Sequence, residues 1–137
     1  MAFTSVAEDV IVQEGTFAFD YDASGTVYAG QGVYAVGTLQ VKAPAVNTKI
    51  AHGCVGVAAY EIADGNPVAV YGPGNIVRCK VSGSSVAVAA GDAMACTAEG
   101  YFTEDQQAQL NACCSGVQAI ALETSTTQHG TIRALLV

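Results

Sequence analysis

Two halves of this chain carry similar short motifs in the same order. Residues 29–35 (AGQGVYA) are echoed by residues 90–96 (AGDAMAC), and residues 56–60 (GVAAY) by residues 116–120 (GVQAI). Both echoes lie roughly 60 residues apart, which is long for a solenoid repeat and is typical of a duplicated β-meander. This spacing predicts a scaffold made of two copies of one strand-turn-strand unit, and it describes no active site.

The local patterns between these motifs favour strands. Residues 64–70 (DGNPVAV) close the first half as residues 129–135 (HGTIRAL) close the second, and residues 16–21 and 76–81 alternate in the manner of half-buried strands. Turn-forming residues recur about every 8–12 residues, which is typical of a sandwich or barrel. We therefore predict an all-β fold, a small β-sandwich or barrel of short antiparallel strands arranged as two duplicated meanders.

The pattern allows at most one short helix, at about residues 104–112 (EDQQAQLNA). Thr103 precedes this segment as a candidate N-cap, and Gln106 stands three residues later at the capping-box position. The length of 137 residues suits one domain. We expect residues 1–9, which carry no period, to form a flexible N-terminal arm, and residues 10–137 to form a single β domain.

The composition indicates a surface that another molecule covers. Charged residues make up 12% of the chain, against about 25% in an average soluble domain. The mean hydropathy is +0.36. Because large exposed apolar surfaces usually mark partner sites, we expect part of this surface to be buried against other protein.

The net charge of −7 argues against direct nucleic-acid binding. The five Lys and Arg residues are spread singly, whereas phosphate binding depends on basic groups acting together. The same argument excludes anionic membrane surfaces, and no apolar run reaches the ~20 residues of a spanning helix. The N-terminus lacks the basic and apolar regions of a secretory signal, so we expect synthesis in the cytoplasm.

The two histidines and five cysteines form no catalytic or metal-binding pattern. His52 stands near Cys54, but we interpret the two as neighbours on a strand rather than as a nucleophile and its base. The cysteine number is odd and no CxxC spacing occurs, so we expect neither a disulfide framework nor structural zinc. We interpret Cys113 and Cys114 as ordinary thiols, with a strained redox bridge as the alternative.

The acidic residues also lack a catalytic arrangement. Residues 20–25 (DYDASG) imitate the start of a calcium loop, but the twelfth position is Gln31, where such a loop requires Glu. We interpret the segment as an Asp-rich turn, with a loose surface calcium site as the alternative. No spacing nominates a carboxylate pair for sugar chemistry. The sequence therefore predicts no catalytic, cofactor-binding or metal-binding residue, no cofactor and no enzymatic activity.

The succession of motifs in the second half is carried by residues 90–96 (AGDAMAC), 99–103 (EGYFT), 116–123 (GVQAIALE) and 130–136 (GTIRALL). Residues 53–58 and 64–70 add to it from the first half. In order, spacing and position this succession resembles small tailed-phage capsid decoration (head cement) proteins related to the DUF2190 family. The chain departs from that pattern at Cys113-Cys114, at Gln118 and in a longer link after Thr103.

The resemblance implies a virion structural protein that binds the outer surface of an icosahedral bacteriophage capsid and stabilises this shell against the pressure of packaged DNA. It implies the major capsid protein as a partner, self-association as a homotrimer, and a location on the capsid exterior after synthesis in the host cytoplasm. Three alternatives stay open. They are a receptor-binding or tail-associated phage protein, a host cell-surface β-sandwich binding module, and an enzyme fragment with a Cys nucleophile.

Overall fold

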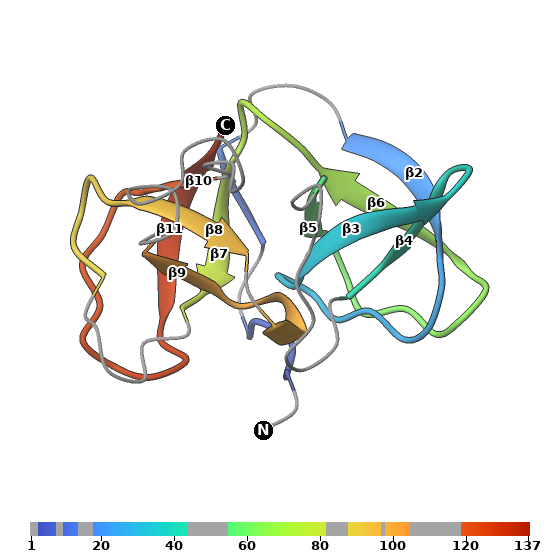
Figure 1. The fold of residues 1–137 in the computed structure, drawn as a ribbon, viewed down its shortest axis with the longest axis horizontal. Helices are drawn as coiled ribbons and strands as arrows, with labels where there is room; N and C mark the ends of the chain where they lie inside the picture. Colours follow the sequence, from blue (N-terminus) through green and yellow to red (C-terminus); the bar gives the residue numbers. More distant parts are fainter. Residues whose placement is uncertain are drawn as a thin grey trace.

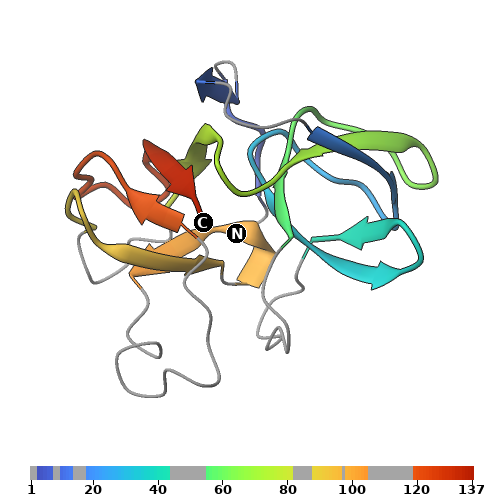
Figure 2. The same ribbon diagram turned by 90° about the horizontal axis from the view of Figure 1, so that it is seen from above.

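Two β lobes lie side by side in the computed structural model (Figure 1), which describes residues 3–7, 10–13, 18–43, 55–81, 88–96, 98–104 and 119–137. The first lobe is a closed barrel with the strand order β2-β4-β3-β5-β6. The second lobe is a six-stranded sheet with the order β1-β7-β11-β10-β8-β9. Figure 2 shows the same two lobes from above, with the chain passing from one to the other along β6 and β7.

The strands are short, and most run between tight turns. Those of the first lobe are β2 (Ala18–Ala23), β3 (Gly32–Gly37), β4 (Gln40–Lys42), β5 (Gly56–Ala58) and β6 (Pro67–Tyr71). Those of the second lobe are β1 (Ile11–Gln13), β7 (Ile76–Lys80), β8 (Ala93–Cys96), β9 (Phe102–Glu104), β10 (Ala119–Ala121) and β11 (Thr131–Leu136), with the 3-10 turn η1 (Ala98–Gly100) between β8 and β9. The all-β prediction is confirmed.

Strand pairing repeats from lobe to lobe. β2 pairs with β6 as β7 pairs with β11, and β5 lies between β3 and β6 as β10 lies between β8 and β11. The hairpin β3–β4 corresponds to β8–β9. Even the parallel pairing of Ala23 with Val41 has a counterpart in the parallel bridge from Val81 to Phe102. The predicted duplication is therefore present as two copies of one five-strand unit.

One detail differs from the predicted meanders, because β2 and β4 are parallel and not antiparallel. In a meander, each strand would pair with the next along the chain. Here β4 lies between β3 and β2, and this parallel contact closes the barrel. Closure removes the exposed strand edges that an open sheet would leave.

The turn that enters β3 is the same as the turn that enters β8. The amide of Gly30 donates to the carbonyl of Ala58, and the amide of Gly91 donates to the carbonyl of Ala121. Both glycines have positive φ, 82° and 95°, a conformation that side chains other than glycine rarely adopt. The echo between residues 29–35 and 90–96 therefore reflects a true structural correspondence.

The other two echoes are shifted in register. Gly56 pairs with Val33 in the first lobe, and the same place in the second lobe is held by Ala119, which pairs with Met94. The predicted counterpart of Gly56, Gly116, is therefore wrong by three residues. Gly, Ala and Val recur so often in this chain that several alignments of the motif look alike, and only strand pairing selects one.

The closing motif is shifted by one residue. Val70 pairs with Ala58 on β5, and Ala134 pairs with Ala121 on β10, so these two residues correspond. The predicted alignment of residues 64–70 with 129–135 instead places Val70 against Leu135. The buried face of the strand fixes the true register, since a slip of one residue would turn every apolar side chain outward.

Each lobe has its own core of small aliphatic side chains. The core of the first lobe consists of Ala23, Val27, Val33, Val41, Ala58, Val68 and Val70. The core of the second lobe is larger, with Val10, Val77, Cys79, Val81, Val88, Met94, Phe102, Ala119, Ala121, Ile132, Ala134 and Leu136. It also includes Val57 from the first lobe, so the two cores meet where the lobes touch.

Three sequence predictions concern segments that are described only in part. Of the helix predicted at about 104–112, Glu104 is described and ends strand β9, and the rest lies outside the described residues. Of the predicted arm, residues 3–7 are described, and Phe3 and Val6 are buried. The flexibility of residues 1–9 and a single domain over 10–137 stay predictions.

No helix among the described residues is long and apolar enough to cross a membrane.

Gly56 offers a test of the packing between β5 and β6. A Cβ atom added to Gly56 would overlap the backbone carbonyl of Tyr71, whereas one added to Gly72 would meet only the carbonyl oxygen of Val55, at an ordinary 3.7 Å. We expect Gly56→Ala to lower the free energy of unfolding by about 1–3 kcal/mol, because backbone cannot move aside as a side chain can. Gly72→Ala is the matched control and should change little. Chemical denaturation of both variants measures the difference, and equal stabilities would contradict the close approach.

Candidate functional site

The two lobes meet at a seam where the β8–β9 turn (residues 98–101) lies against the start of β3. Gln31 is buried there, with 3% of its surface exposed. Its side-chain amide donates to the carbonyl of Glu99 at 2.8 Å, and its side-chain oxygen accepts from the amide of Tyr28 at 3.0 Å. Because a buried amide needs partners for both its oxygen and its nitrogen, Gln31 ties the turn of one lobe to the other.

Two glycines allow the lobes to approach closely at this seam. A Cβ atom on Gly32 would lie 2.6 Å from Sγ of Cys96 and 3.3 Å from the carbonyl oxygen of Gly100. A Cβ atom on Gly100 would lie 2.8 Å from the carbonyl oxygen of Gly32. Gly100 also has a φ of 89°, which favours glycine for a second reason. The seam is therefore a backbone-to-backbone contact.

Aromatic side chains from distant parts of the sequence gather beside the seam. The ring of Phe3 lies 4.8 Å from that of Tyr101 and 6.5 Å from that of Tyr28. Tyr101 in turn stacks on His129, with ring centroids 4.1 Å apart and planes within 9°. The ammonium of Lys80 lies 5.4 Å from the Phe3 ring centroid, within the range of a cation–π contact.

The environment of this aromatic group shifts two pKa values. Burial lowers the pKa of Lys80, because removal from water disfavours the charged ammonium. Burial raises the pKa of Tyr101, and the nearby negative charge of Glu99 raises it further. Both pKa shifts favour the neutral form of the side chain, as expected for groups partly removed from water.

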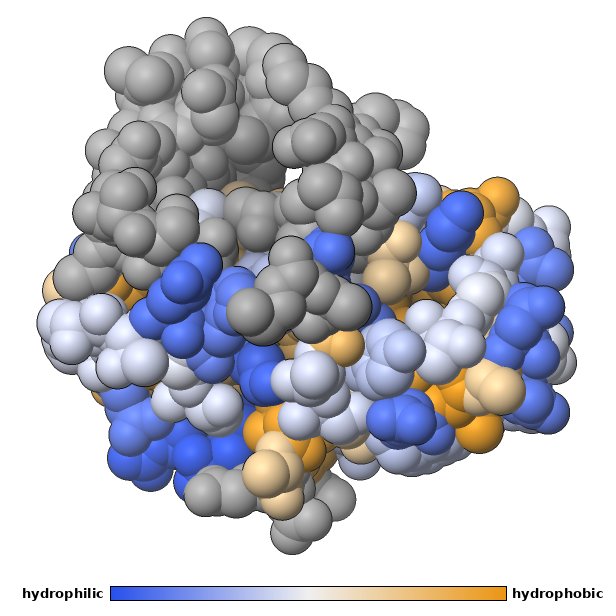
Figure 3. All heavy atoms as spheres, turned by 90° about the horizontal axis from the view of Figure 1, so that it is seen from below, coloured by the Kyte–Doolittle hydropathy of each residue, from blue (hydrophilic) through white to orange (hydrophobic). Residues whose placement is uncertain are grey.

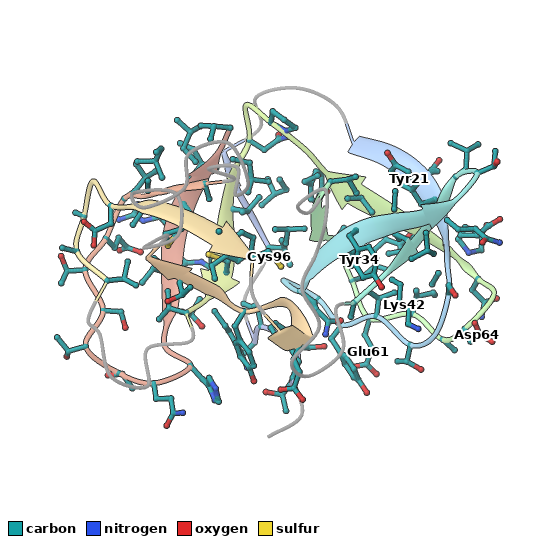
Figure 4. All side chains as sticks on the ribbon, viewed as in Figure 1. Tyr21, Tyr34, Lys42, Glu61, Asp64 and Cys96 are labelled. Atoms are coloured by element: carbon teal, nitrogen blue, oxygen red, sulfur yellow. The ribbon has the colours of Figure 1, made fainter. Side chains whose placement is uncertain are left out.

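The histidines and cysteines of the sequence do not converge on a reactive centre among the described residues. His129 belongs to the aromatic stack, Cys79 is buried in the core of the second lobe, and Cys96 lies at the seam. Figure 4 places Cys96 between the lobes, well away from the labelled acidic side chains Glu61 and Asp64. The other residues considered for a thiol or metal site, His52, Cys54, Cys113 and Cys114, lie outside the described residues.

The acidic residues serve as local ties. The carboxylate of Asp64 accepts a hydrogen bond from the amide of Gly25 at 2.7 Å, and that of Glu61 accepts one from the hydroxyl of Ser5 at 3.0 Å. The calcium-like segment begins on strand β2, and no group of three or more His, Cys, Asp or Glu side chains that could hold a metal ion occurs in the described part of the chain.

Glu123 and Arg133 make a two-point contact on the outer face of the second lobe. The carboxylate of Glu123 accepts from the backbone amide of Arg133 at 2.7 Å and from its guanidinium at 3.2 Å. The side-chain hydrogen bond from Arg133 is the largest cause that lowers the pKa of Glu123, followed by the backbone hydrogen bond. Glu123, two residues beyond the end of β10, therefore holds this segment against β11.

The outer surface mixes apolar and polar side chains. Figure 3 shows hydrophobic residues scattered among hydrophilic ones on the face seen from below. The exposed large apolar side chains among the described residues are Val36, Leu39, Tyr60, Leu122 and Val137. Two of them, Val36 and Leu39, stand together at the end of the β3–β4 hairpin. Sequence patterns did not single out this hairpin, because a turn with one Val and one Leu is common.

Comparison with solved structures finds a likeness in fold. The fold is similar to that of the head fiber gp8.5 N base of bacteriophage phi29, with a TM-score of 0.61, 18% sequence identity, and coverage of 88% of this chain and 92% of the other. At this identity the likeness concerns the fold. No protein-family model matches the chain, and no curated protein matches it, so the predicted relation to the DUF2190 family is not confirmed.

Gln31 allows a test of how strongly the seam couples the lobes. We expect Gln31→Ala to lower the free energy of unfolding by about 1–3 kcal/mol, because the carbonyl of Glu99 and the amide of Tyr28 lose a buried partner. The matched control is Asp92→Ala, since Asp92 accepts from the amide of Ala89 in the equivalent turn of the second lobe, where the hydrogen bond is solvent-exposed and Asp92 is only partly buried. Its cost should be about 0.5–1 kcal/mol. Equal costs in urea denaturation would contradict a coupling role for Gln31.

The Glu123 contact predicts a specific pH dependence. Because the folded-state pKa lies below the ordinary value of 4.5, the contact contributes stability above that value and loses it as the pH falls through the folded-state pKa. We expect native protein to be more stable than Glu123→Gln at neutral pH, and the difference to shrink at about pH 3. Urea denaturation at both pH values measures it. A difference that does not change with pH would contradict the pKa shift.

Proposed function

We propose that this chain is a phage virion structural protein that binds the outer surface of an icosahedral capsid and stabilises it against the pressure of packaged DNA. The observation that carries the proposal is the fold shared with a phage head fiber base over most of both chains. The motif succession of the second half supports the same class of protein from the sequence alone.

The architecture suits a protein that acts by contact. Two lobes with separate cores are joined by a seam of backbone and buried hydrogen bonds, so the outer faces are held in a fixed relation. A protein that stabilises a capsid must stay bound to the shell under pressure, and this task requires no catalysis. Each copy needs only a modest affinity, because several linked copies that grip neighbouring subunits gain through effective concentration.

The charge and hydropathy of the chain support protein partners. With 12% charged residues and a net charge of −7, the chain has few basic groups for contacts with nucleic acid or anionic membranes. The proposed partners are the major capsid protein and further copies of this chain, associated as a homotrimer. The proposed location is the exterior of the capsid, after synthesis in the host cytoplasm.

A second candidate is the base of a fiber attached to the phage head. The structurally similar protein is described as a head fiber base, and in this role the chain would attach a fiber to the head. The two functions differ in their effect on the particle. A cement protein raises the resistance of the shell to internal pressure, whereas a fiber base binds without needing to do so.

Purified protein added to capsids that lack it tests both candidates. We expect it to sediment with the capsids, to saturate at a fixed number of copies per shell, and to bind expanded shells more tightly than unexpanded ones. DNA-filled capsids should then release their DNA at a higher temperature, because the bound protein opposes the outward pressure. Release is followed with a DNA-binding dye, and heat-denatured protein is the control for non-specific adsorption.

The results of this experiment distinguish the two proposed functions. Saturable sedimentation with an unchanged release temperature would favour the fiber base over the cement protein. Failure to sediment with either form of the shell would contradict a capsid-binding function. Turnover of a small molecule by a thiol that alkylation blocks would contradict the non-enzymatic reading.

A further inference from the structure

The duplicated unit uses its hairpin differently in the two lobes. In the second lobe the β8–β9 turn lies against the first lobe, at Gln31 and Gly32. In the first lobe the equivalent β3–β4 hairpin ends on the side of the barrel that faces away from the second lobe (Figure 1). Its side chains are correspondingly exposed, 41% for Val36 and 64% for Leu39. We call residues 36–39 the free tip.

The surface that receives the docked turn is a row of residues across three strands of the first lobe. Gly32 of β3 pairs with Val57 of β5, which pairs with Tyr71 of β6. Val57 points away from the core of its own barrel and is nonetheless 0% exposed, because it packs in the core of the second lobe. Tyr71 packs against the same core. In the first lobe this row is therefore covered by the second lobe.

The equivalent row in the second lobe is apolar and only half-buried. Ala93 pairs with Ile120, Ile120 with Leu135, and Leu135 with Ile76. All four side chains alternate with buried core residues on their strands, and all four are partly exposed. We call these four residues the open row. A continuous apolar row across four strands of a sheet is a surface that protein contacts usually cover.

The lobe-to-lobe contact is therefore head-to-tail. A two-fold arrangement would place the free tip on the open row within the same chain, and the exposure of Val36 and Leu39 excludes this. The second lobe contributes its turn to the contact, and the first lobe contributes its row. Each chain therefore has one free tip, on the first lobe, and one open row, on the second lobe. Contacts of this kind repeat from molecule to molecule until a ring closes.

The backbone of the free tip supports a role outside the chain. Leu39 has a φ of 53°, in the left-handed region that disfavours side chains. Val41 of the first lobe and Phe102 of the second lobe hold equivalent places in the parallel pairing. Leu39 and Gly100 each stand two residues before them, and Gly100 has a φ of 89°. The free tip thus carries a leucine where glycine suits the backbone, and within the chain this side chain is mostly in water.

Charges beside the two surfaces are opposite in sign. The amide of Asp22 donates to the carbonyl of Leu39 at 2.8 Å, so an exposed acidic residue stands next to the free tip. Beside the open row stand two basic residues, Arg78 and Arg133, which pair across β7 and β11 two residues along from Ile76 and Leu135. The ion pair of Arg133 with Glu123 offsets part of this positive charge. Complementary charge at the edge of an interface guides docking and increases the rate of association.

We infer that a second copy of this chain occupies the open row, with the free tip of one chain packed on the row of the next. Each intermolecular contact uses the surfaces equivalent to those of the seam, with a wider backbone spacing because Ala93 and Leu39 stand where Gly32 and Gly100 meet, so a homotrimer contains a ring of six similar lobes. This inference specifies the self-contact of the proposed homotrimer, and it does not depend on binding to a capsid.

The test measures the mass of the full chain in solution by sedimentation equilibrium and native mass spectrometry. The native protein should have three times its 13.9 kDa chain mass. Leu39→Lys and Ile120→Glu should each weaken association by about tenfold or more, because a charge enters the apolar contact. The double variant Leu39→Lys/Ile120→Glu should regain association, since every contact then joins opposite charges. Thr126→Lys, at an exposed position of a second-lobe loop, is the control and should associate as the native chain does.

Loss of folding is separated from loss of association by a further variant. Leu39→Gly should unfold at the same or a higher denaturant concentration, because glycine suits the positive φ, and should still associate about tenfold more weakly. A native chain that stays monomeric up to its solubility limit would overturn the inference. So would association that neither Leu39→Lys nor Ile120→Glu weakens.

Because no capsid is present in this experiment, its failure and the failure of the proposed function are distinguishable. A monomeric chain that still sediments with capsids removes the self-contact and leaves capsid binding intact. A trimer that does not sediment with capsids supports the self-contact and contradicts the proposed function.

Discussion

The close backbone contact between the β8–β9 turn and the start of β3 determines how the two lobes sit together. Gly32 and Gly100 lie so close that no side chain fits between them, and Gln31 satisfies both ends of its amide in the same place. The aromatic stack and the burial of Phe3 and Val6 depend on this approach. A contact made of backbone leaves little freedom for one lobe to move against the other.

Duplication followed by head-to-tail docking explains where equivalent residues diverge. The positions that meet at the seam are glycines, Gly32 and Gly100, whereas the positions equivalent to them carry Ala93 and Leu39. A symmetric pair would have needed the same residue at both places. The covered surface must fit the neighbouring lobe, whereas the open surface carries apolar side chains that the proposed self-contact would bury.

Several titratable groups among the described residues hold the fold. Asp64 and Glu123 accept backbone hydrogen bonds at strand connections, and His129 stacks on Tyr101. Their partners fix strand ends and turns, and they do not converge on a shared cleft. This use of charge agrees with a protein whose outer faces, and not an internal pocket, carry its proposed function.

The sequence by itself determined the all-β class, the duplication and the correspondence of residues 29–35 with 90–96, because alternation and turn residues are local properties of the chain. It could not fix the register of the other echoes, since Gly, Ala and Val repeat too often for local patterns to choose. The parallel closure of β2 on β4 and the docking of the lobes were decided by tertiary structure alone. Both features join residues that are far apart in sequence. Local sequence does not distinguish the glycines of the seam from other glycines, because only the residues packed against them do so.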